Sequence, residues 1–384
     1  MNAGEQTAWI VRRARTLGFD LCGVSSVEAY RAEASHLEQW LARGFAGQMR
    51  YLQDPRRRDP ELVLPGARSI VVCALNYNTD LPYSTEVLPD DEVPRGWISR
   101  YAWGADYHHV LGQRLEALLE AMRAHLPVPF AARWYVDTGP VVERIAARCA
   151  GLGWLAKNTC LIHEGLGSWL FLGVILTTLE LASTQPAEGP PPDQCGQCTL
   201  CIEACPTAAL VAPYLLDPRR CISYLTIELR GEIPEEFRAA VGRHIFGCDL
   251  CQDVCPWNRK APVTPLAEWA PRELSVADGA EPRSLFSPEL DWLLGLTEAE
   301  FRALFRRSAI RRARWQGLLR NVCVALGNWL ARRRPGSASS RPGSESDAVV
   351  QRVVALLERL AGSEDPVIAV QARHALRGHP PPEG

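Results

Sequence analysis

Eight of the 13 cysteines fall in one short part of the chain, between Cys195 and Cys255. The first run, CGQCTLCIEACP, has the spacing C-x2-C-x2-C-x3-C-P, and the second run, CDLCQDVCP, supplies three more cysteines before another proline. Successive x2 spacings wrap three thiolates around one corner of an iron–sulfur cube. Structural zinc usually takes its four cysteines as two separated C-x-x-C pairs. The pattern therefore favours [4Fe–4S] clusters, with zinc as the alternative.

The spacing also predicts which cysteines bind which cluster. In ferredoxins with two clusters, the last cysteine of such a run ligates the other cluster. This rule divides the eight cysteines into one set of Cys195, Cys198, Cys201 and Cys255 and a second set of Cys205, Cys221, Cys248 and Cys251. Cys221 enters the second set because it is the one remaining cysteine between the two runs. Two adjacent clusters indicate electron transfer, so the rest of the chain should hold the group that receives the electrons.

The other five cysteines are scattered, and we expect them to pack in the interior: Cys22, Cys73, Cys149, Cys160 and Cys323. The N-terminus has no apolar core typical of a signal peptide. The longest apolar stretch, at 168–181, is too short to span a membrane. These features predict a cytoplasmic protein, in which cysteines bind metals or do chemistry instead of forming disulfides.

Residues 1–185 alternate between helical and strand patterns, which is typical of an α/β domain. We expect helices at 6–19, 37–45 and 107–126 and strands at 20–26, 67–77, 131–137 and 167–181. The last of these helices begins within the motif DYHHVLG, which departs from the cobalamin motif D-x-H-x-x-G at Leu111. We therefore expect His108 and His109 to lie on a helix surface. No GxGxxG or P-loop motif indicates a nucleotide cofactor.

Asp137 is the candidate catalytic residue of this region. It ends a predicted strand, and Thr138 and Pro140 predict that a helix begins directly after it and stops at Gly151. The carboxyl end of a strand is where open α/β sheets bind ligands. The alternative is that Asp137 only caps the helix.

The C-terminal part is helical and partly basic. Residues 301–334 hold ten arginines and no acidic residue. Within them 309–333 has the pattern of a basic amphipathic helix, with an apolar face of Trp315, Leu318, Leu319, Val322 and Leu326. The charge indicates an anionic partner, first of all nucleic acid, and a solvated helix face is the alternative. Two further helices, at 348–362 and 365–378, resemble a HEAT repeat, and 335–347 is expected to be a disordered insert.

Taken together, these motifs resemble the epoxyqueuosine reductase family over residues 5–380. The similarity rests on RYAWGADYHHVL, VDTGPVVERIAARCAGLGWLAKNTCLI, GSWLFLGVILT, both cysteine runs with RRCISYLTIELRG between them, and AIRRARWQGLLRN. The resemblance implies an α/β (α+β) cobalamin-binding catalytic domain at 1–185, a ferredoxin-like domain with two [4Fe–4S] clusters at 186–265, and a helical HEAT-like tRNA-binding region at 266–384.

The resemblance also implies an activity, which is that of an oxidoreductase. Members of the family reduce epoxyqueuosine to queuosine at the wobble position of tRNA, the last step of queuosine biosynthesis. Electrons would pass through the two clusters to a base-off cobalamin, which takes no histidine ligand from the protein. The alternatives are a cobalamin-dependent enzyme of the reductive dehalogenase kind, acting on a small molecule, and a ferredoxin-like electron carrier.

Family residues carry over onto matching positions of this sequence. Asp137 matches the catalytic acid, and a carboxyl group beside a buried corrin is expected to have a raised pKa. The positions that match cobalamin contacts are Arg57, Ala102, Asp137, Leu161, Leu172 and Ser223. Arg230 falls in the loop that approaches tRNA. We expect a monomer that binds the anticodon stem-loop and an electron donor, with no membrane partner.

Overall fold

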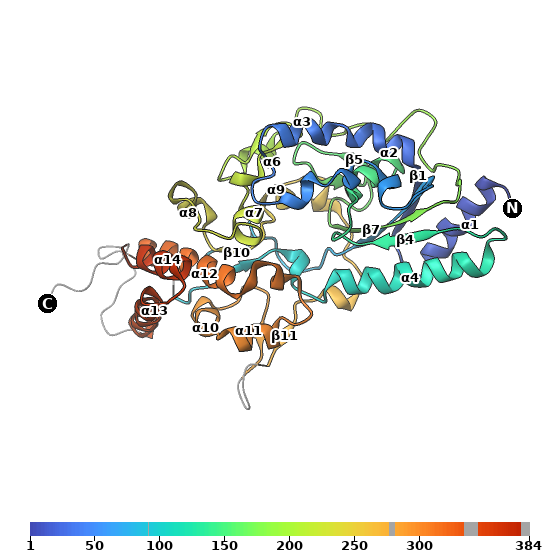
Figure 1. The fold of residues 1–384 in the computed structure, drawn as a ribbon. Helices are drawn as coiled ribbons and strands as arrows, with labels where there is room; N and C mark the ends of the chain where they lie inside the picture. Colours follow the sequence, from blue (N-terminus) through green and yellow to red (C-terminus); the bar gives the residue numbers. More distant parts are fainter. Residues whose placement is uncertain (91, 276–280, 334–344, 378–384) are drawn as a thin grey trace.

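An antiparallel sheet of four strands forms the centre of the N-terminal part, in the order β1-β2-β7-β4 (Figure 1). The computed structural model describes residues 1–90, 92–275, 281–333 and 345–377. The strands are β1 (Leu21–Ser26), β2 (Ser69–Asn76), β4 (Ala132–Tyr135) and β7 (Leu170–Thr177). Since every neighbouring pair is antiparallel, the domain is α+β and lacks the parallel sheet of an open α/β fold.

Helices cover both faces of this sheet because its central strands are apolar on both sides. All eight residues of β2 are buried, and alternate residues enter two different apolar clusters. One cluster contains α1 (Ala3–Thr16) and α4 (Tyr107–His125), and the other contains α2 (Val27–Ala34) and α5 (Glu143–Cys149). The short helix α3 (His36–Ala42) follows α2. The expected helices and strands of this part are confirmed, with ends that differ by a few residues.

Residues 186–265, expected to form the iron–sulfur domain and called the iron–sulfur part below, consist of short elements. Short elements are expected where cysteine ligation replaces a large core. They are α6 (Leu200–Glu203), β8 (Leu210–Ala212), β9 (Leu215–Leu216), α7 (Ile222–Ile227), α8 (Glu235–Val241), β10 (His244–Phe246) and α9 (Leu250–Asp253). Each cysteine run forms a single helical turn, α6 or α9, and these two turns pack together. Strand β10 pairs with β3 (Trp97–Ile98), which joins this part to the segment before α4.

Further short elements lie in the connections. The remaining strands are β5 (Trp154–Leu155), β6 (Leu161–Ile162), β11 (Glu273–Leu274) and β12 (Arg283–Ser284). The 3₁₀ helices are η1 (Arg50–Gln53), η2 (Pro55–Arg57), η3 (Pro60–Leu62), η4 (Arg100–Ala102), η5 (Pro218–Arg220), η6 (Asn258–Lys260), η7 (Ala267–Trp269) and η8 (Ala309–Ala313). No described helix combines the length and the apolar character that crossing a membrane requires.

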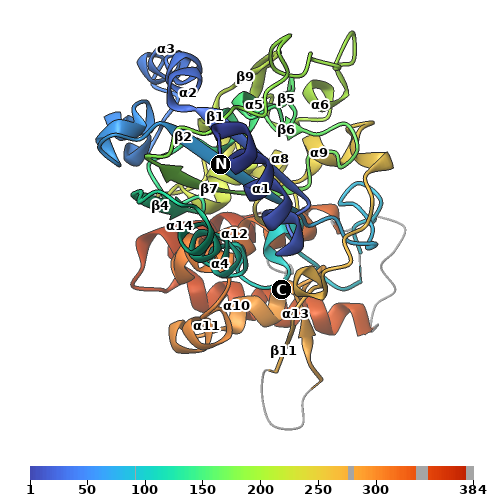
Figure 2. The ribbon, with the colours of Figure 1, turned by 90° about the vertical axis from the view of Figure 1, so that its right-hand side faces the viewer.

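The C-terminal part is built around one long helix. Its helices are α10 (Leu290–Gly295), α11 (Glu298–Leu304), α12 (Arg314–Arg332), α13 (Glu345–Ala361) and α14 (Pro366–Arg377). In Figures 1 and 2 they lie on the side of α4, away from α2 and α3. Helix α12 contacts α10, α13 and α14 as well as α7, α8 and β10 of the iron–sulfur part. It is therefore the core helix of this region.

Two expectations for this region were wrong in part. The basic helix expected at 309–333 is divided into η8 and α12, because Arg314 has a backbone φ of 63°. Most of α12 is buried, so it is not a basic surface helix, although the apolar face expected on it is present. Of the insert expected at 335–347, residues 335–344 lie outside the described residues, whereas 345–347 begin α13.

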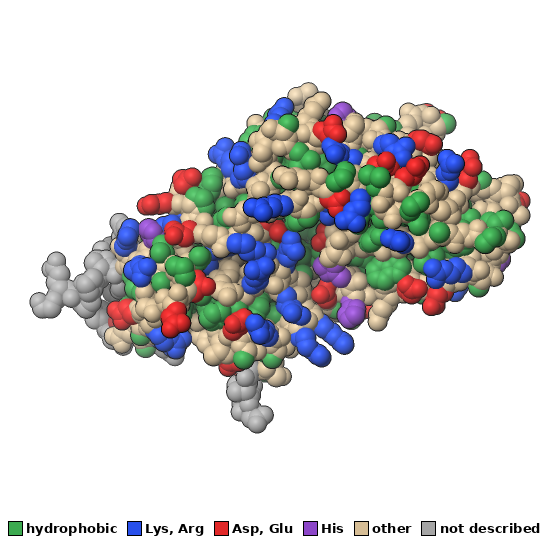
Figure 3. Space-filling model, viewed as in Figure 1, with side chains coloured by type: hydrophobic (Ala, Val, Ile, Leu, Met, Phe, Trp, Pro, Cys, Tyr) green, Lys and Arg blue, Asp and Glu red, His purple; other side chains and the backbone are tan. Residues whose placement is uncertain are grey.

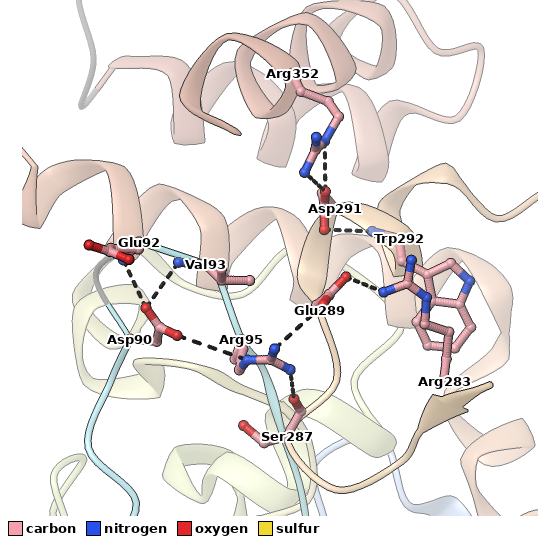
Figure 4. Close-up of polar contacts among 10 residues, drawn as sticks. All are labelled: Asp90, Glu92, Val93, Arg95, Arg283, Ser287, Glu289, Asp291, Trp292 and Arg352. Carbon is pink, nitrogen blue, oxygen red and sulfur yellow. Dashed lines mark hydrogen bonds and ion pairs between the residues drawn. The ribbon is translucent and has the colours of Figure 1, made fainter. Parts of the chain in front are cut away.

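Polar contacts tie the C-terminal helices to the segment before β3, as Figure 4 shows. The guanidinium of Arg95 contacts Glu289 at 3.4 Å and the carbonyl oxygen of Ser287 at 3.2 Å. Between two of the C-terminal helices, Arg352 of α13 donates to Asp291 of α10 at 2.8 Å. Residues 97–103 share one apolar cluster with α10, α12, α13 and α14. The segment that leads into α4 is therefore held between the sheet and the C-terminal helices.

Candidate redox and proton-transfer site

The four cysteines expected for the first cluster surround one cavity of about 270 Å³. Cys195, Cys198 and Cys201 come from the first run and Cys255 from the second, which the packing of α6 on α9 brings together. The crossed assignment thus corresponds to a single enclosure lined by four thiols. Such an enclosure fits a four-iron cluster in its number and type of ligands.

The cysteines expected for the second cluster also lie together. Burial raises the pKa of Cys248, and the neighbouring thiols of Cys221 and Cys205 raise it further. The pKa of Cys251 is raised first by its hydrogen bond with Cys160, then by burial and by Cys248. We expected Cys160 to be an ordinary core cysteine. It is instead a neighbour of this second set. Cys22, Cys73, Cys149 and Cys323 are buried.

A buried carboxylate fixes the second cysteine run to the segment before α4. Asp249, directly after Cys248, accepts hydrogen bonds from Trp97 Nε1 at 3.1 Å, from Arg100 N at 2.8 Å and from Ser99 Oγ. Burial raises the pKa of Asp249, and these three donors oppose the shift. The cysteine set beside it is therefore held rigidly against the part of the chain that carries α4.

The loop after β4 places Asp137 against the beginning of α4. Tyr107 Oη donates a hydrogen bond of 2.6 Å to Asp137 Oδ2. His108 Nε2 lies 3.6 Å from the same oxygen, an ion-pair distance slightly too long for a hydrogen bond. On its other side, His108 Nδ1 lies 2.7 Å from Asp106 Oδ1. The Asp137 N–H donates to Glu143 Oε1 at 2.8 Å, which fixes the loop to the first residue of α5.

Asp137 does not cap a helix. Helix α5 begins at Glu143 with Val142 at its N-cap, so the helix start expected at Thr138 and Pro140 was wrong, whereas the stop at Gly151 is confirmed by its φ of 75°. Asp137 has a φ of 57°, which is unfavourable for a residue with a side chain and is often found at functional sites. Its side chain remains 66% exposed, although desolvation by surrounding protein acts on it strongly.

Two neighbours determine the electrostatics of this group. Desolvation acts to raise the pKa of Asp137, but His108 and Tyr107 outweigh it and lower the pKa. The raised pKa expected beside a buried corrin stays a prediction. Burial acts to lower the pKa of His108, but Asp106 and Asp137 raise it to about 9. Burial, assisted by the charge of Asp137, raises the pKa of Glu143 to about 7. At neutral pH the transferable proton therefore resides on His108, beside an ionised Asp137.

Sequence reasoning missed His108 and Tyr107 as members of this site. The expectation of a helix-surface position is confirmed for His109, which is exposed, but His108 is half-buried against Asp137. A usable signal was present in the sequence. Asp106 is the N-cap of α4 and accepts from His108 N at 3.1 Å, so the Asp-x-His spacing places the imidazole over the first helical turn.

Some of the expected cofactor residues gather near Asp137. Leu161 of β6 and Leu172 of β7 share one apolar cluster with Val141, and buried Arg57 donates to the Val141 carbonyl at 3.3 Å. Leu172 is only half-buried on a strand that is otherwise largely buried. Strand β4 pairs with β7 up to Tyr135, which opposes Val174, two residues from Leu172. Leu172 thus offers partly exposed apolar surface near the end of β4, which fits the edge of a large, flat cofactor.

The other two expected contacts belong to different elements. Ser223 lies in α7, two residues after Cys221 of the second cysteine set. Ala102 lies in η4 and is 2% exposed, within the apolar cluster of the C-terminal helices. Its side chain is therefore packed in a core, and only its backbone is available to a ligand.

Exposed arginines form a basic face on the segment before α12. They are Arg306, Arg307, Arg311, Arg312 and Arg314. Figure 3 shows Lys and Arg side chains gathered over this region. Arg312 forms two hydrogen bonds with Glu228, at 2.9 and 2.8 Å. Arg230 donates to the carbonyl oxygens of Ala313 and Arg312 at 3.2 and 3.0 Å, so it supports the backbone of this face.

Arg320 belongs to the same run in the sequence but has a structural role. Its guanidinium is buried and donates to the carbonyl oxygens of Leu225, Leu229 and Gly231 at 2.5–2.7 Å. Burial lowers its pKa to about 10. Neither of the alternatives considered for the arginine run, a binding face or a solvated face, applies to this residue.

Comparisons with known proteins agree with these features. Residues 194–258 match the family model "4Fe-4S double cluster binding domain", and residues 57–138 match the model "Epoxyqueuosine reductase QueG, DUF1730". The epoxyqueuosine reductase of Gloeobacter violaceus is 47% identical, covering 83% of this chain and 95% of that protein. The one from Xanthomonas campestris is 40% identical, covering 95% of this chain and 94% of that protein.

The overall fold is also that of solved relatives. The crystal structure of an epoxyqueuosine reductase with a tRNA-Tyr epoxyqueuosine-modified tRNA stem loop is 26% identical, with a TM-score of 0.77, over 98% of this chain and 99% of that chain. The expected iron–sulfur domain and the expected family are both confirmed. On the identity and coverage of these relatives, the chain belongs to the epoxyqueuosine reductase family.

Proposed function

We propose that this protein reduces epoxyqueuosine to queuosine at the wobble position of tRNA, the last step of queuosine biosynthesis. It is an oxidoreductase that acts in the cytoplasm, where its tRNA substrate is found. The observation that carries the proposal is the presence, in one chain of this family, of two four-cysteine sets and a carboxylate–imidazole pair formed by Asp137 and His108. Electron delivery and proton delivery are both required for this reaction.

Two [4Fe–4S] clusters and a base-off cobalamin are the cofactors of the proposal. The proposed domains of the chain are an α+β catalytic domain at 1–185, a ferredoxin-like domain at 186–265 and a helical HEAT-like region at 266–384. The cluster ligands are those of the two cysteine sets, and Arg57, Ala102, Asp137, Leu161, Leu172 and Ser223 hold the cobalamin. The base-off form is supported by His108, because both of its ring nitrogens face carboxylates and are not directed at a metal.

The residues around Asp137 provide the proton chemistry. Conversion of an epoxide to an alkene and water consumes two electrons and two protons. Bound cobalamin would supply the low-potential metal that delivers the electrons to the substrate. His108 holds one of the two protons at neutral pH and passes it through Nε2 to Asp137 Oδ2, from which it reaches the epoxide oxygen. The second proton is taken up from water. Tyr107 fixes that oxygen at 2.6 Å, and Asp106 keeps the imidazole oriented and protonated.

The basic face before α12 binds the tRNA. Its exposed arginines neutralise backbone phosphates of the anticodon stem-loop, which is the usual source of affinity for nucleic acid. Arg230 adds a positive charge from the adjacent loop, and its hydrogen bonds to the Ala313 and Arg312 carbonyl oxygens connect that loop to this face. The protein acts as a monomer and receives its electrons from a separate electron donor.

The proposal is tested in cells that lack their own epoxyqueuosine reductase and therefore accumulate the epoxide in tRNA. Expression of this chain is expected to convert the modified nucleoside to queuosine, as read by mass spectrometry of digested tRNA. The matched control is the D137A variant, which should accumulate to the same level without conversion. Unchanged epoxyqueuosine in cells that hold the iron-loaded wild-type protein would contradict the proposed substrate.

A further inference from the structure

The lysines of this chain are confined to one place. All but two of the 42 basic Lys and Arg side chains are arginines, and the two lysines are Lys157 and Lys260. Both line the cavity that is surrounded by Cys195, Cys198, Cys201 and Cys255. A chain that uses arginine for every other basic position thus has lysine only at the wall of this cavity. The ammonium group is a compact charge, whereas guanidinium is a broad planar fork, so the two are not interchangeable in a confined space.

The two lysines differ in burial. Lys260 is exposed at the end of η6, while Lys157 is only 9% exposed. The Lys157 ammonium donates to the carbonyl oxygen of Gly196 at 2.6 Å and to that of Cys198 at 3.0 Å. Its backbone N–H is also directed at the sulfur of Cys195. Lys157, which lies outside the first cysteine run, therefore contacts three residues of that run, Cys195, Gly196 and Cys198.

The ammonium of Lys157 has no carboxylate in direct contact. Among the described residues, none places a carboxylate oxygen within ion-pair distance of it, and it contacts only carbonyl oxygens. Asp193 attracts it from a longer distance, but that carboxylate accepts hydrogen bonds from Tyr214 and from Cys195 N. A buried charge is costly unless an opposite charge lies close to it. A four-iron cluster bound by four thiolates is an anion, and it becomes more negative when it is reduced. The cavity that Lys157 lines would therefore hold the nearer counter-charge.

We propose that Lys157 is the counter-ion of the first cluster and a positioning residue for its ligands. Through the two carbonyl oxygens it holds loop 195–201 closed around the cluster. Through its positive charge it stabilises the reduced form, which raises the reduction potential of that cluster and favours electron entry. This inference rests on the proposed function only in that the cavity is taken to hold a [4Fe–4S] cluster.

The experiment is a redox titration of the reconstituted full chain, followed by electron paramagnetic resonance, with iron content measured in parallel. The K157Q variant removes the charge but can still donate to a carbonyl oxygen. K157R retains the charge, and K260Q removes one charge from the exposed wall of the same cavity. The C198A variant identifies the first cluster as the one whose reduction step is lost.

The expected result is specific to charge. K157Q should lower the equilibrium constant for one-electron reduction of the first cluster at least about tenfold, a shift of about 59 mV to more negative potential. The step of the second cluster should stay unchanged. K260Q should shift the first step by less than half as much, because water screens an exposed charge. If K157Q cannot retain the cluster, retention of iron by K157R would support the same role for the charge.

Three outcomes would overturn the inference. They are an unshifted potential in an iron-replete K157Q variant, equal shifts in K157Q and K260Q, and equal iron loss in K157Q and K157R. The last of these would indicate that shape, and not charge, is what the site requires. A wild-type protein that binds no cluster in this cavity would instead contradict the proposed function itself, so the two failures are distinguishable.

Discussion

The Nε2 atom of His108 lies 3.6 Å from Oδ2 of Asp137. The other ring nitrogen of His108 faces Asp106 at 2.7 Å, so one imidazole is held between two carboxylates. This arrangement explains why the pKa of His108 is raised while that of Asp137 is lowered. In the proposed mechanism, Asp137 is the last member of a relay whose stored proton is on the histidine.

Replacement of Asp137 by asparagine should abolish most turnover. The amide keeps the size of the side chain but cannot deliver a proton, and general acid catalysis typically contributes about 10²–10⁴-fold. Iron content should equal that of the wild type, because no cluster ligand is touched, and most of the corrinoid should be retained, because asparagine keeps the size of the side chain and the other proposed cobalamin contacts are unchanged. The measurement is the anaerobic single-turnover rate with modified tRNA. Turnover within a few-fold of the wild type would remove Asp137 from this role.

The pH dependence of turnover should report His108. Because its pKa is raised to about 9, the imidazolium persists at neutral pH and turnover should fall as pH rises through about 9. The H108Q variant should be slower and should lose this alkaline limb. H109Q, which changes the exposed neighbour, is the matched control and should keep it. An alkaline limb that is the same in H108Q and in the wild type would contradict the relay.

The same shift predicts how stability changes with pH. A histidine whose pKa is higher in the folded than in the unfolded chain stabilises the fold fully below about 6.5, and this contribution is lost as pH rises through about 9. The melting temperature of the wild type should therefore fall more between pH 7 and pH 10 than that of H108Q. Parallel curves for the two proteins would show that His108 gains no charge partner on folding.

Much of the fold was predictable because its signals are local. Apolar periodicity indicates the four strands of the sheet and the helices α1 and α4, and cysteine spacing indicates the iron–sulfur domain. The start of α5 was not predictable from Thr138 and Pro140, because the φ of Asp137 and its contact with Glu143 displace the helix. The pKa of Asp137 depends on His108, which lies on a different element, and no local pattern gives that contact.

The arginine run shows the same limit. Its composition indicates a basic surface, and seven of its described arginines are exposed. Composition alone cannot distinguish these from Arg320, because only the packing of α12 against α7 and β10 buries that side chain. Long-range packing, and not the local sequence, thus decides which arginines are available to a ligand.

Binding of tRNA should weaken steeply with salt. Each phosphate neutralised by an arginine contributes about 0.7–0.9 to the slope of log affinity against log salt concentration. The R306Q/R307Q double variant should therefore bind more weakly and with a slope smaller by about 1.4–1.8. R12Q/R15Q, on the exposed side of α1, is the charge-matched control. Equal affinities and slopes for all three proteins would place the tRNA elsewhere.

Replacement of Arg320 by methionine should destabilise the fold without acting on tRNA directly. The change removes the donor from one buried and two partly buried carbonyl oxygens. A buried acceptor left without a donor costs about 1–3 kcal/mol, so the free energy of unfolding should fall by about 2 kcal/mol or more. R306M, an exposed arginine in the same run, should stay within about 0.5 kcal/mol of the wild type. Chemical denaturation measures both variants, and equal stabilities would contradict the structural role of Arg320.

The most direct test of the central claim is anaerobic turnover with purified components. The chain is reconstituted with iron, sulfide and cobalamin, reduced, and mixed with tRNA that carries epoxyqueuosine, and the digested nucleosides are analysed by mass spectrometry. The account predicts loss of one oxygen atom from the modified base, with queuosine as the product and consumption of two electrons for each base converted. Epoxyqueuosine that persists in the presence of protein loaded with both iron and cobalt would contradict it.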